Sequence, residues 1–340
     1  MTTNLLDIAN NLQPGNSLES RSTDVLVVDG LNILMRAFAV IESINPSGYN
    51  VGGLTGFLKT LGALRRQFNP QRIVVAWDGK GGTTNRKNAN SNYKAQRAHA
   101  AVIHWDVYDN KEEEMQSVHE QSERVLDYLD CLPVTYLKMD KLEADDVIAY
   151  VSRLLDYKQK HVTIVSSDKD FLQLVSDNIE VYNPVKKELY NYEHALDFLG
   201  VLPENYNIVK ALVGDKSDNV VGIRGLGVKT LVKLFPELQT DPTYSLQRLY
   251  DSCAENVENK KCATILNDWN RVETNFNIMN LQETVLSGPE KDFVIHELSR
   301  EVPNLQIGKF LCLLNQDQID GFSKDTENWL LEFSRLIPRK

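Results

Sequence analysis

Nine carboxylate residues, in small groups, could form a metal site. They are Asp29, Asp78, Glu143, Asp145, Asp146, Asp168, Asp170, Asp215 and Asp218. If they converge, cations have to relieve their mutual repulsion, and oxygen ligands without histidine or cysteine select Mg²⁺ or Mn²⁺ over Zn²⁺. Two such ions activate water and stabilise the leaving oxygen of a phosphoryl displacement. The pattern predicts two or three Mg²⁺ ions, which Mn²⁺ can replace.

Each acidic group also has a structural interpretation. An aspartate after a strand commonly caps the next helix, and acids in a first helical turn favour the helix dipole. Acids in a turn often accept local backbone hydrogen bonds. For any single group this interpretation is the stronger one, and the complete set favours a metal site.

A basic segment follows Asp78 in the sequence. Within Asn92–Ala98, Lys94 and Arg97 lie three residues apart, so they share one face if the segment is helical, and Tyr93 lies beside them. Cations next to an aromatic ring suit a phosphodiester and a stacked base. A solvated surface helix is the alternative.

A glycine-rich turn precedes a second basic element. Gly222, Gly225 and Gly227 lead into a predicted helix that carries Lys229 and Thr230. Free backbone N–H groups at a helix start hold a phosphate without reading base sequence. A glycine that ends one helix before the next begins is an equally strong interpretation.

The elements that position these residues are strands alternating with helices. Three apolar runs begin at Asp24, Arg72 and His161, and each ends abruptly at turn residues. Near-continuous apolar runs are typical of parallel strands buried on both faces. The fold class expected is α/β, with a central, mostly parallel sheet flanked by helices. Because ligands bind beyond the carboxyl ends of such strands, the acids that follow them should converge.

The chain divides into three expected regions. Residues 1–23 are a polar, mobile arm, residues 24–204 an α/β domain, and residues 205–340 an all-helical region. Within the α/β domain, residues 83–111 are too long for a plain connection and should overhang the crevice. The amphipathic stretch that begins at Trp329 is expected to cover the core of the second domain.

Composition fits a globular protein, and its charge is unevenly distributed. The 340 residues carry 37 Lys and Arg against 47 Asp and Glu, a net charge of −10, which taken alone argues against nucleic-acid binding. Residues 59–102, however, hold nine basic residues and one acid, which indicates a surface for an anionic partner. No signal peptide, membrane span or C-x-x-C spacing is present, so a cytoplasmic, reducing location is expected.

Six motifs, in one order, carry a resemblance to a known family. They are DG at Asp29, WDG at Asp78, YKAQRA at Tyr93–Ala98, LEADD at Leu142–Asp146, SSDKDFLQL at Ser166–Leu174 and GDKSDNVVGIRGLGVKT at Gly214–Thr230. Over residues 24–235 the chain resembles the 5′ nuclease superfamily, which includes flap endonucleases and the 5′–3′ exonuclease domain of bacterial polymerase I. Without a polymerase domain, it is similar to the stand-alone phage type, such as the T-even phage ribonuclease H.

The resemblance implies an arch at 83–111, a helix-two-turn-helix at 208–235 and roles for several residues. The nine acids match the metal-cluster positions, with Asp145 and Asp168 essential for catalysis. Lys94 and Arg97 match the arch residues that steer the scissile phosphate, Tyr93 stacks on a base, and Arg36 lies near the DNA junction. Arg86 and Lys87 stand where many members have an SFRHE-like sequence and are expected to contact DNA in its place. Gly222, Gly225, Gly227, Lys229 and Thr230 grip one duplex strand, with a K⁺ ion held by backbone carbonyls.

The implied activity is Mg²⁺-dependent hydrolysis from the 5′ end by a monomeric enzyme. Its substrates would be branched or nicked duplex DNA and RNA–DNA hybrids, including 5′ flaps and RNA primers in phage-type replication. A catalytically weak junction-binding protein and an RNA-directed ribonuclease are the alternatives. A sliding clamp and a single-strand binding protein are further candidate partners. The clamp-like peptide Gln318–Phe322, however, is better interpreted as a chance match.

Overall fold

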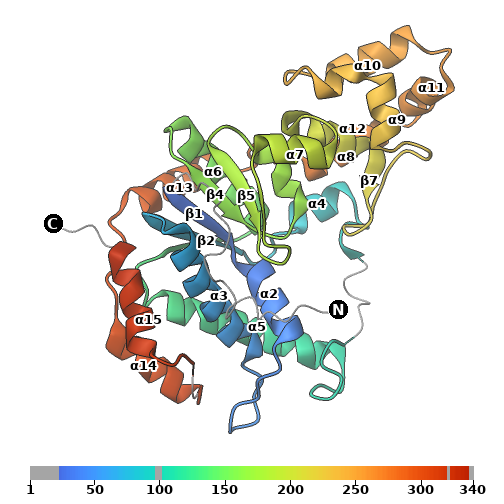
Figure 1. The fold of residues 1–340 in the computed structure, drawn as a ribbon. Helices are drawn as coiled ribbons and strands as arrows, with labels where there is room; N and C mark the ends of the chain where they lie inside the picture. The colour runs from blue at the N-terminus through green and yellow to red at the C-terminus, as the bar shows by residue number, and fades with distance from the viewer. Residues whose placement is uncertain (1–22, 96–101, 320–321, 337–340) are drawn as a thin grey trace.

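A mostly parallel, six-stranded sheet forms the centre of the molecule. The structure, a computed structural model, describes residues 23–95, 102–319 and 322–336. The strands are β1 (Val25–Asp29), β2 (Arg72–Asp78), β3 (Thr135–Met139), β4 (Val162–Val165), β5 (Ile179–Asn183) and β6 (Glu188–Tyr190). Their order is β3-β2-β1-β4-β5-β6, and only β6 is antiparallel to its neighbour. The expected α/β fold is confirmed, and the three expected strands are adjacent at its centre (Figure 1).

Helices cover both faces of the sheet, as the apolar strands predict. One face packs on α2 (Gly30–Val40), α3 (Gly52–Phe68) and α5 (Lys111–Leu129), and the other on α6 (Ala144–Tyr157). Along β1, Leu26 and Val28 enter the first core, whereas Val25 and Val27 enter the second. All four are at least 94% buried, because successive side chains of a strand point to opposite faces.

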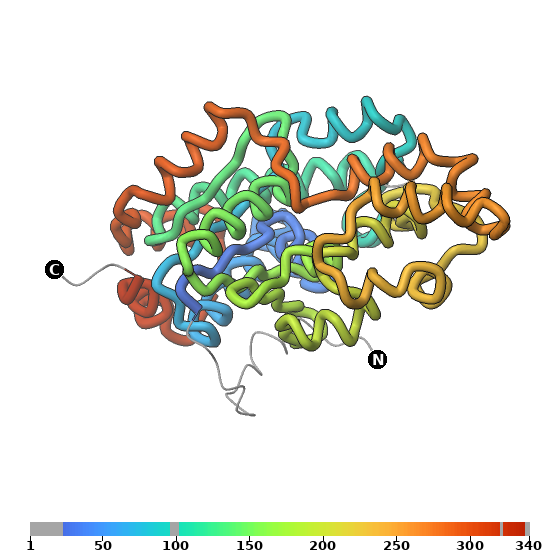
Figure 2. Tube along the Cα trace, turned by 90° about the horizontal axis from the view of Figure 1, so that it is seen from above, coloured from blue at the N-terminus to red at the C-terminus, as the bar shows by residue number. Residues whose placement is uncertain are grey.

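The C-terminal half is almost entirely helical, and residues 206–279 form a lobe beside the sheet, whereas α13 (Gly288–Ser299) lies back against β3 (Figures 1 and 2). The elements of this half are α7 (Tyr192–Leu199), α8 (Tyr206–Val213), α9 (Val228–Leu234), α10 (Leu246–Glu255), α11 (Lys260–Asn267), α12 (Trp269–Met279) and α13. A short antiparallel pair, β7 (Gly214–Asp215) and β8 (Val220–Val221), interrupts the helices. The helix-two-turn-helix predicted at 208–235 therefore corresponds to α8, this strand pair, a glycine turn and α9.

The last helices return to the α/β domain, contrary to the expectation for the stretch at Trp329. Helices α14 (Ile307–Gln316) and α15 (Thr326–Phe333) pack in the same core as α3 and α5, and α15 lies against α3 (Figure 1). The Trp329 ring packs so closely over Gly62 that a Cβ there would lie 2.1 Å from the indole nitrogen. The tail covers the first domain because the outer side of α3 is itself apolar.

The predicted arch is only partly described. Its first part forms α4 (Thr84–Ala89), followed by turns. Residues 96–101 lie outside the described residues, as do residues 1–22 of the arm expected at 1–23. Lys94 has a φ of 55°, so no continuous helix runs through it. Arg97 itself, and part of the clamp-like peptide, fall outside the described residues. Among those described, no helix has the length and apolarity needed to cross a bilayer.

Candidate active site

The carboxyl ends of three adjacent strands bring the predicted acids together. Asp29 ends β1, Asp78 ends β2, and Asp168 follows β4 after two serines. The Asp78 carboxylate accepts a hydrogen bond from the backbone N–H of Ala144 at 2.7 Å, which holds the first turn of α6 at the end of β2. That turn carries three more acids of the set: Glu143, Asp145 and Asp146.

Asp29 is held in place by its own backbone and by the neighbouring strand. Its carboxylate caps α2 by accepting from the N–H of Asn32 at 3.1 Å, and it accepts from the Ser166 hydroxyl at 2.9 Å. Helix α2 can start directly after β1 because residue 30 is glycine, since a Cβ there would lie 2.1 Å from the Trp77 ring. The capping role that sequence alone favours for Asp29 is therefore present, and the same side chain also faces the other acids.

Three of the acids lie at or beside the strand ends and are here called the central trio: Asp29, which is buried, and Asp145 and Asp168, which are half-buried. Burial, with added repulsion from Asp78 and Asp168, raises the pKa of Asp29 to about 7. Burial, with repulsion from Asp168 and Asp29, raises the pKa of Asp145 well above its ordinary value. The repulsion that these carboxylates exert on one another indicates that they face the same region at the strand ends. No salt bridge joins any of them to a described cation.

Other acids of the set are paired with basic side chains. Arg86 on α4 bonds to Glu143 at 2.8 Å and to Asp146 at 2.6 Å, and these acids raise its pKa against the opposing effect of burial. Lys94 Nζ lies 3.1 Å from both carboxylate oxygens of Glu143, and the Tyr93 hydroxyl donates to the same group at 3.2 Å. Sequence comparison assigned Arg86 to DNA binding, whereas here it neutralises acids of the cluster.

Lys210 is a residue of the site that the sequence analysis missed. Its ammonium group pairs with Asp170 and, at 2.7 Å, with Asp215, although its side chain is only 5% exposed. Burial raises the pKa of Asp170 to about 7 in spite of this pairing, whereas Lys210 overcomes burial at Asp215 and lowers that pKa to about 2. The sequence offered one signal for this residue. Lys210 is a lysine within the mostly apolar helical stretch NYNIVKALVG, five residues before Asp215.

The eighth and ninth acids lie on the β7–β8 loop. Gly214 begins this loop with a φ of 77°, and a Cβ on Gly214 would lie 2.3 Å from the backbone nitrogen of Gly222. Asp218 uses its backbone carbonyl to accept from the N–H of Lys94 at 2.9 Å. The loop that carries Asp215 and Asp218 is thus joined to the base of the arch.

The predicted DNA contacts are only partly accessible. Arg36 donates to the Ser167 hydroxyl at 2.6 Å and lies beside Asp168, at the mouth of the trio. Tyr93 is only 3% exposed and packs with Val220, Ile278 and Met279, so its ring is not presented to a base as expected.

The remaining predicted contacts lie along α4 and the glycine turn. Lys87 and Lys229 are exposed, and Thr230 is half-buried. Gly222 packs tightly against the end of α8, where a Cβ would lie 2.1 Å from the Val213 carbonyl oxygen. Gly225 supplies a positive φ of 80°, and Gly227 precedes α9 without a side-chain cap.

The donor set fits hard divalent cations. All nine candidate ligands offer carboxylate oxygens, which Mg²⁺ and Mn²⁺ prefer. Among the described residues, one group of three side chains brings its possible ligand atoms within 4.8 Å of one another. It consists of Glu42, His104 and Asp106, which do not belong to the acidic cluster. No three described acids of the cluster bring their oxygens within that distance of one another. The central trio is therefore the part of the cluster with the greatest need for an added cation.

Comparison with known proteins agrees with the family that the sequence motifs resemble. A family described as 5′-3′ exonuclease, N-terminal resolvase-like domain, matches residues 24–200. A 5′-3′ exonuclease of Aquifex aeolicus is 34% identical over 209 residues, covering 61% of this chain and 67% of the relative. The DNA polymerase I of Streptococcus pneumoniae (strain R6) is 28% identical over 285 residues, which are 78% of this chain but 30% of that protein.

Solved structures share the fold. The bacteriophage T5 flap endonuclease, in a complex with DNA and metal ions, matches with a TM-score of 0.62 at 18% identity, covering 86% of this chain and 99% of that one. The catalytic core of Rad2, in complex with a DNA substrate, matches with a TM-score of 0.58 at 18% identity, covering 96% and 98%. Given the matched family domain and the acids at its strand ends, this chain belongs to the 5′-3′ exonuclease family of the 5′ nuclease superfamily.

Proposed function

We propose that this protein is a structure-specific 5′–3′ exonuclease and flap endonuclease that needs divalent metal ions. The central trio supports this proposal most strongly, because these buried and half-buried carboxylates have no salt-bridged cation among the described residues, which favours binding of a divalent ion. Its relatives are named 5′-3′ exonucleases, and a structural neighbour is a flap endonuclease bound to DNA and metal ions.

The ions would be Mg²⁺, with Mn²⁺ as a substitute. Asp29, Asp145 and Asp168 would hold them together with acids released from their basic partners. When bound, two ions supply a hydroxide nucleophile at neutral pH and stabilise the leaving oxygen.

The basic residues around the trio would orient the substrate. Arg36 is anchored on Ser167 beside Asp168, where its guanidinium can hold a phosphate of the cleaved strand. Lys94 has its backbone fixed to Asp218, so its ammonium group can leave Glu143 for a phosphate without moving the chain. Lys229 and the N–H groups of the glycine turn would bind the duplex backbone without reading sequence.

The substrates proposed are nicked or branched duplex DNA and RNA–DNA hybrids, with removal of 5′ flaps and RNA primers in replication. The net charge of −10 does not oppose this, because nine of the 47 acidic residues belong to the cluster, where bound cations would offset their charge. The K⁺ site at the glycine turn, a clamp or single-strand-binding partner, and the monomeric state remain predictions.

The test is cleavage of 5′-labelled duplexes that carry a DNA flap or an RNA primer, with Mg²⁺ or with EDTA. Asp145→Asn and Asp168→Asn should each lower kcat/KM on the order of 10³-fold or more while binding the flap substrate as wild type does. Asp251→Asn, on the exposed face of α10, is the matched control and should cleave normally. Normal cleavage by both trio variants would contradict the metal assignment, and junction binding without cleavage by wild type would favour a binding protein.

A further inference from the structure

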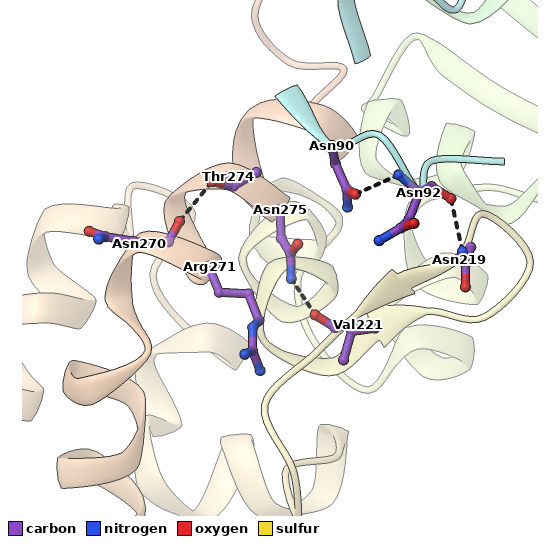
Figure 3. A pocket seen from close by; sticks show the side chains of 8 residues that line it. All are labelled: Asn90, Asn92, Asn219, Val221, Asn270, Arg271, Thr274 and Asn275. Carbon is purple, nitrogen blue, oxygen red and sulfur yellow. Dashed lines mark hydrogen bonds between the residues drawn. The ribbon is translucent and has the colours of Figure 1, made fainter. Parts of the chain in front are cut away.

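A cavity of about 430 Å³ lies beside the candidate active site, between the base of the arch, the β7–β8 loop and α12 (Figure 3). Its walls come from Asn90, Asn92, Asn219, Val221, Asn270, Arg271, Thr274 and Asn275. Five of these eight residues are asparagines, and none is acidic. The volume lies within the range of small-molecule sites, of about 300–1,000 Å³.

Several of the amide groups keep hydrogen-bonding capacity toward the cavity. Asn275 is 98% buried, and its Nδ2 donates to the carbonyls of Ala211 and Val221 at 3.0 Å, which fixes the amide (Figure 3). Its Oδ1 has no hydrogen-bond donor among the described residues. Asn90 accepts from the N–H of Asn92 through Oδ1, and its Nδ2 and the Asn92 amide likewise have no described partner.

This chemistry selects a nucleotide among the classes of ligand. Side-chain amides offer a donor and an acceptor side by side, which is the pattern that reads the edge of a base. Arg271 is 45% exposed and can meet a phosphate or lie flat on a base, and Val221, 65% exposed, adds an apolar wall. A metal ion or a basic peptide would need acidic ligands, which this lining lacks.

The cavity shares a wall with the candidate active site. The Asn219 side chain donates to the Asn92 carbonyl at 2.9 Å (Figure 3), and the next contact along the same two segments joins Lys94 to Asp218. A group in the cavity therefore lies within a few residues of the proposed phosphate-binding lysine. A base that is paired and stacked in a duplex cannot enter such a cavity, so the occupant has to be unpaired.

We propose that this cavity is a base-binding subsite, which holds an unpaired nucleobase of the cleaved strand next to the scissile phosphate. The inference rests on the proposed function. It adds a preference for 5′ ends of the cleaved strand whose terminal nucleotide can leave the base stack of the duplex. Asn92 and Asn275 would bind the base edge, and Arg271 would contact its ring or phosphate.

The test compares flap substrates that have either a normal base or an abasic site at the first unpaired nucleotide. Wild type should lose about 5- to 20-fold in kcat/KM on the abasic substrate, which is the range of a single bound base. Asn92→Ala and Arg271→Ala should each lose several-fold on the normal substrate and show a smaller additional loss on the abasic one. Arg300→Ala is the matched control, because both arginines are exposed and pair with an acid three residues earlier.

A second measurement does not depend on cleavage. With 2-aminopurine at the same nucleotide and Asp168→Asn as the background, binding should change the fluorescence, and adding Asn92→Ala should reduce that change. Two results would overturn the subsite without contradicting metal-dependent cleavage. One is an equal loss of kcat/KM on the abasic substrate in wild type and both variants, and the other is a fluorescence change that Asn92→Ala does not reduce. Absence of metal-dependent cleavage by wild type would instead contradict the proposed function.

Discussion

The acidic cluster contains two kinds of carboxylate. Asp215 is paired with Lys210 at 2.7 Å, and its pKa is lowered to about 2. Asp29 lies in the same cluster but has hydroxyl and amide partners and no salt bridge, and burial raises its pKa to about 7. The two side chains are chemically identical, so the difference comes from their surroundings.

This contrast shows how a metal site can be built in a stable protein. Burying a charge costs several kcal/mol unless a partner offsets the loss of water. Arg86, Lys94 and Lys210 supply that partner for four outer acids, Glu143, Asp146, Asp170 and Asp215. Among the described residues, the central trio has no basic partner within salt-bridge distance. The outer acids would keep the cluster folded before metal binds, and the trio would supply affinity for the ion.

The largest effect is expected from replacing Lys210, the buried lysine that pairs with Asp170 and Asp215. Lys210→Met leaves Asp170 and Asp215 buried without their cation and should lower the free energy of unfolding by about 3–5 kcal/mol. Chemical denaturation of the metal-free protein measures this effect. Lys216→Met, at an exposed position of the next loop, should change stability by less than about 1 kcal/mol. A loss of similar size in both variants would show that the buried pairing is not what stabilises the site.

The pH dependence of stability provides a second test. A carboxyl whose pKa is raised in the folded state binds more protons there than in the unfolded chain, so stability falls as pH rises from the ordinary value near 4 toward about 7. The metal-free protein should lose roughly 2–4 kcal/mol between pH 5 and pH 8. In Asp29→Asn that decrease should be smaller by roughly a third, because one of the three raised groups, Asp29, Asp145 and Asp170, no longer titrates. Stability that rises over this interval would contradict the raised pKa of these carboxyl groups.

The smallest expected effect concerns competition between Arg86 and the metal ion. Arg86 occupies oxygens of Glu143 and Asp146, so Arg86→Gln should free them and tighten Mg²⁺ binding by about 3- to 10-fold, an effect of roughly 1 kcal/mol. Isothermal titration calorimetry measures the affinity directly, without DNA. Lys87→Gln removes a charge from the same helix at an exposed position and is the control. Weaker binding in Arg86→Gln would show that the arginine organises the ligands instead of competing for them.

Local sequence was sufficient for the three central strands of the sheet, β1, β2 and β4, and for the placement of most acids. Apolar runs that end in Asp29 and Asp78 require buried strands with acids at their carboxyl ends, because only a parallel sheet covered on both faces accepts such runs. Strand β3 was not anticipated, since its residues alternate between buried and half-buried positions and the run carries Lys138.

The partners of the acids could not be predicted in the same way. Arg86 and Glu143 are 57 residues apart, and Lys210 and Asp170 are 40 apart, so no local pattern relates them. Tyr93 was expected at the surface and is buried, because α12 supplies Ile278 and Met279 to cover its ring. The Asn-lined cavity likewise combines three segments that no motif connects.

Residue types and their order were thus enough to establish the family, the sheet and a candidate set of metal ligands, because these depend on local periodicity and on strand ends. Which acids carry a basic partner, which aromatic ring is covered and which domain the C-terminal helices join depend on contacts between distant segments. Such contacts are set by packing and by the cost of burying charge. Packing and the cost of burying charge act between distant segments only in the folded chain, so only the tertiary structure could decide these contacts.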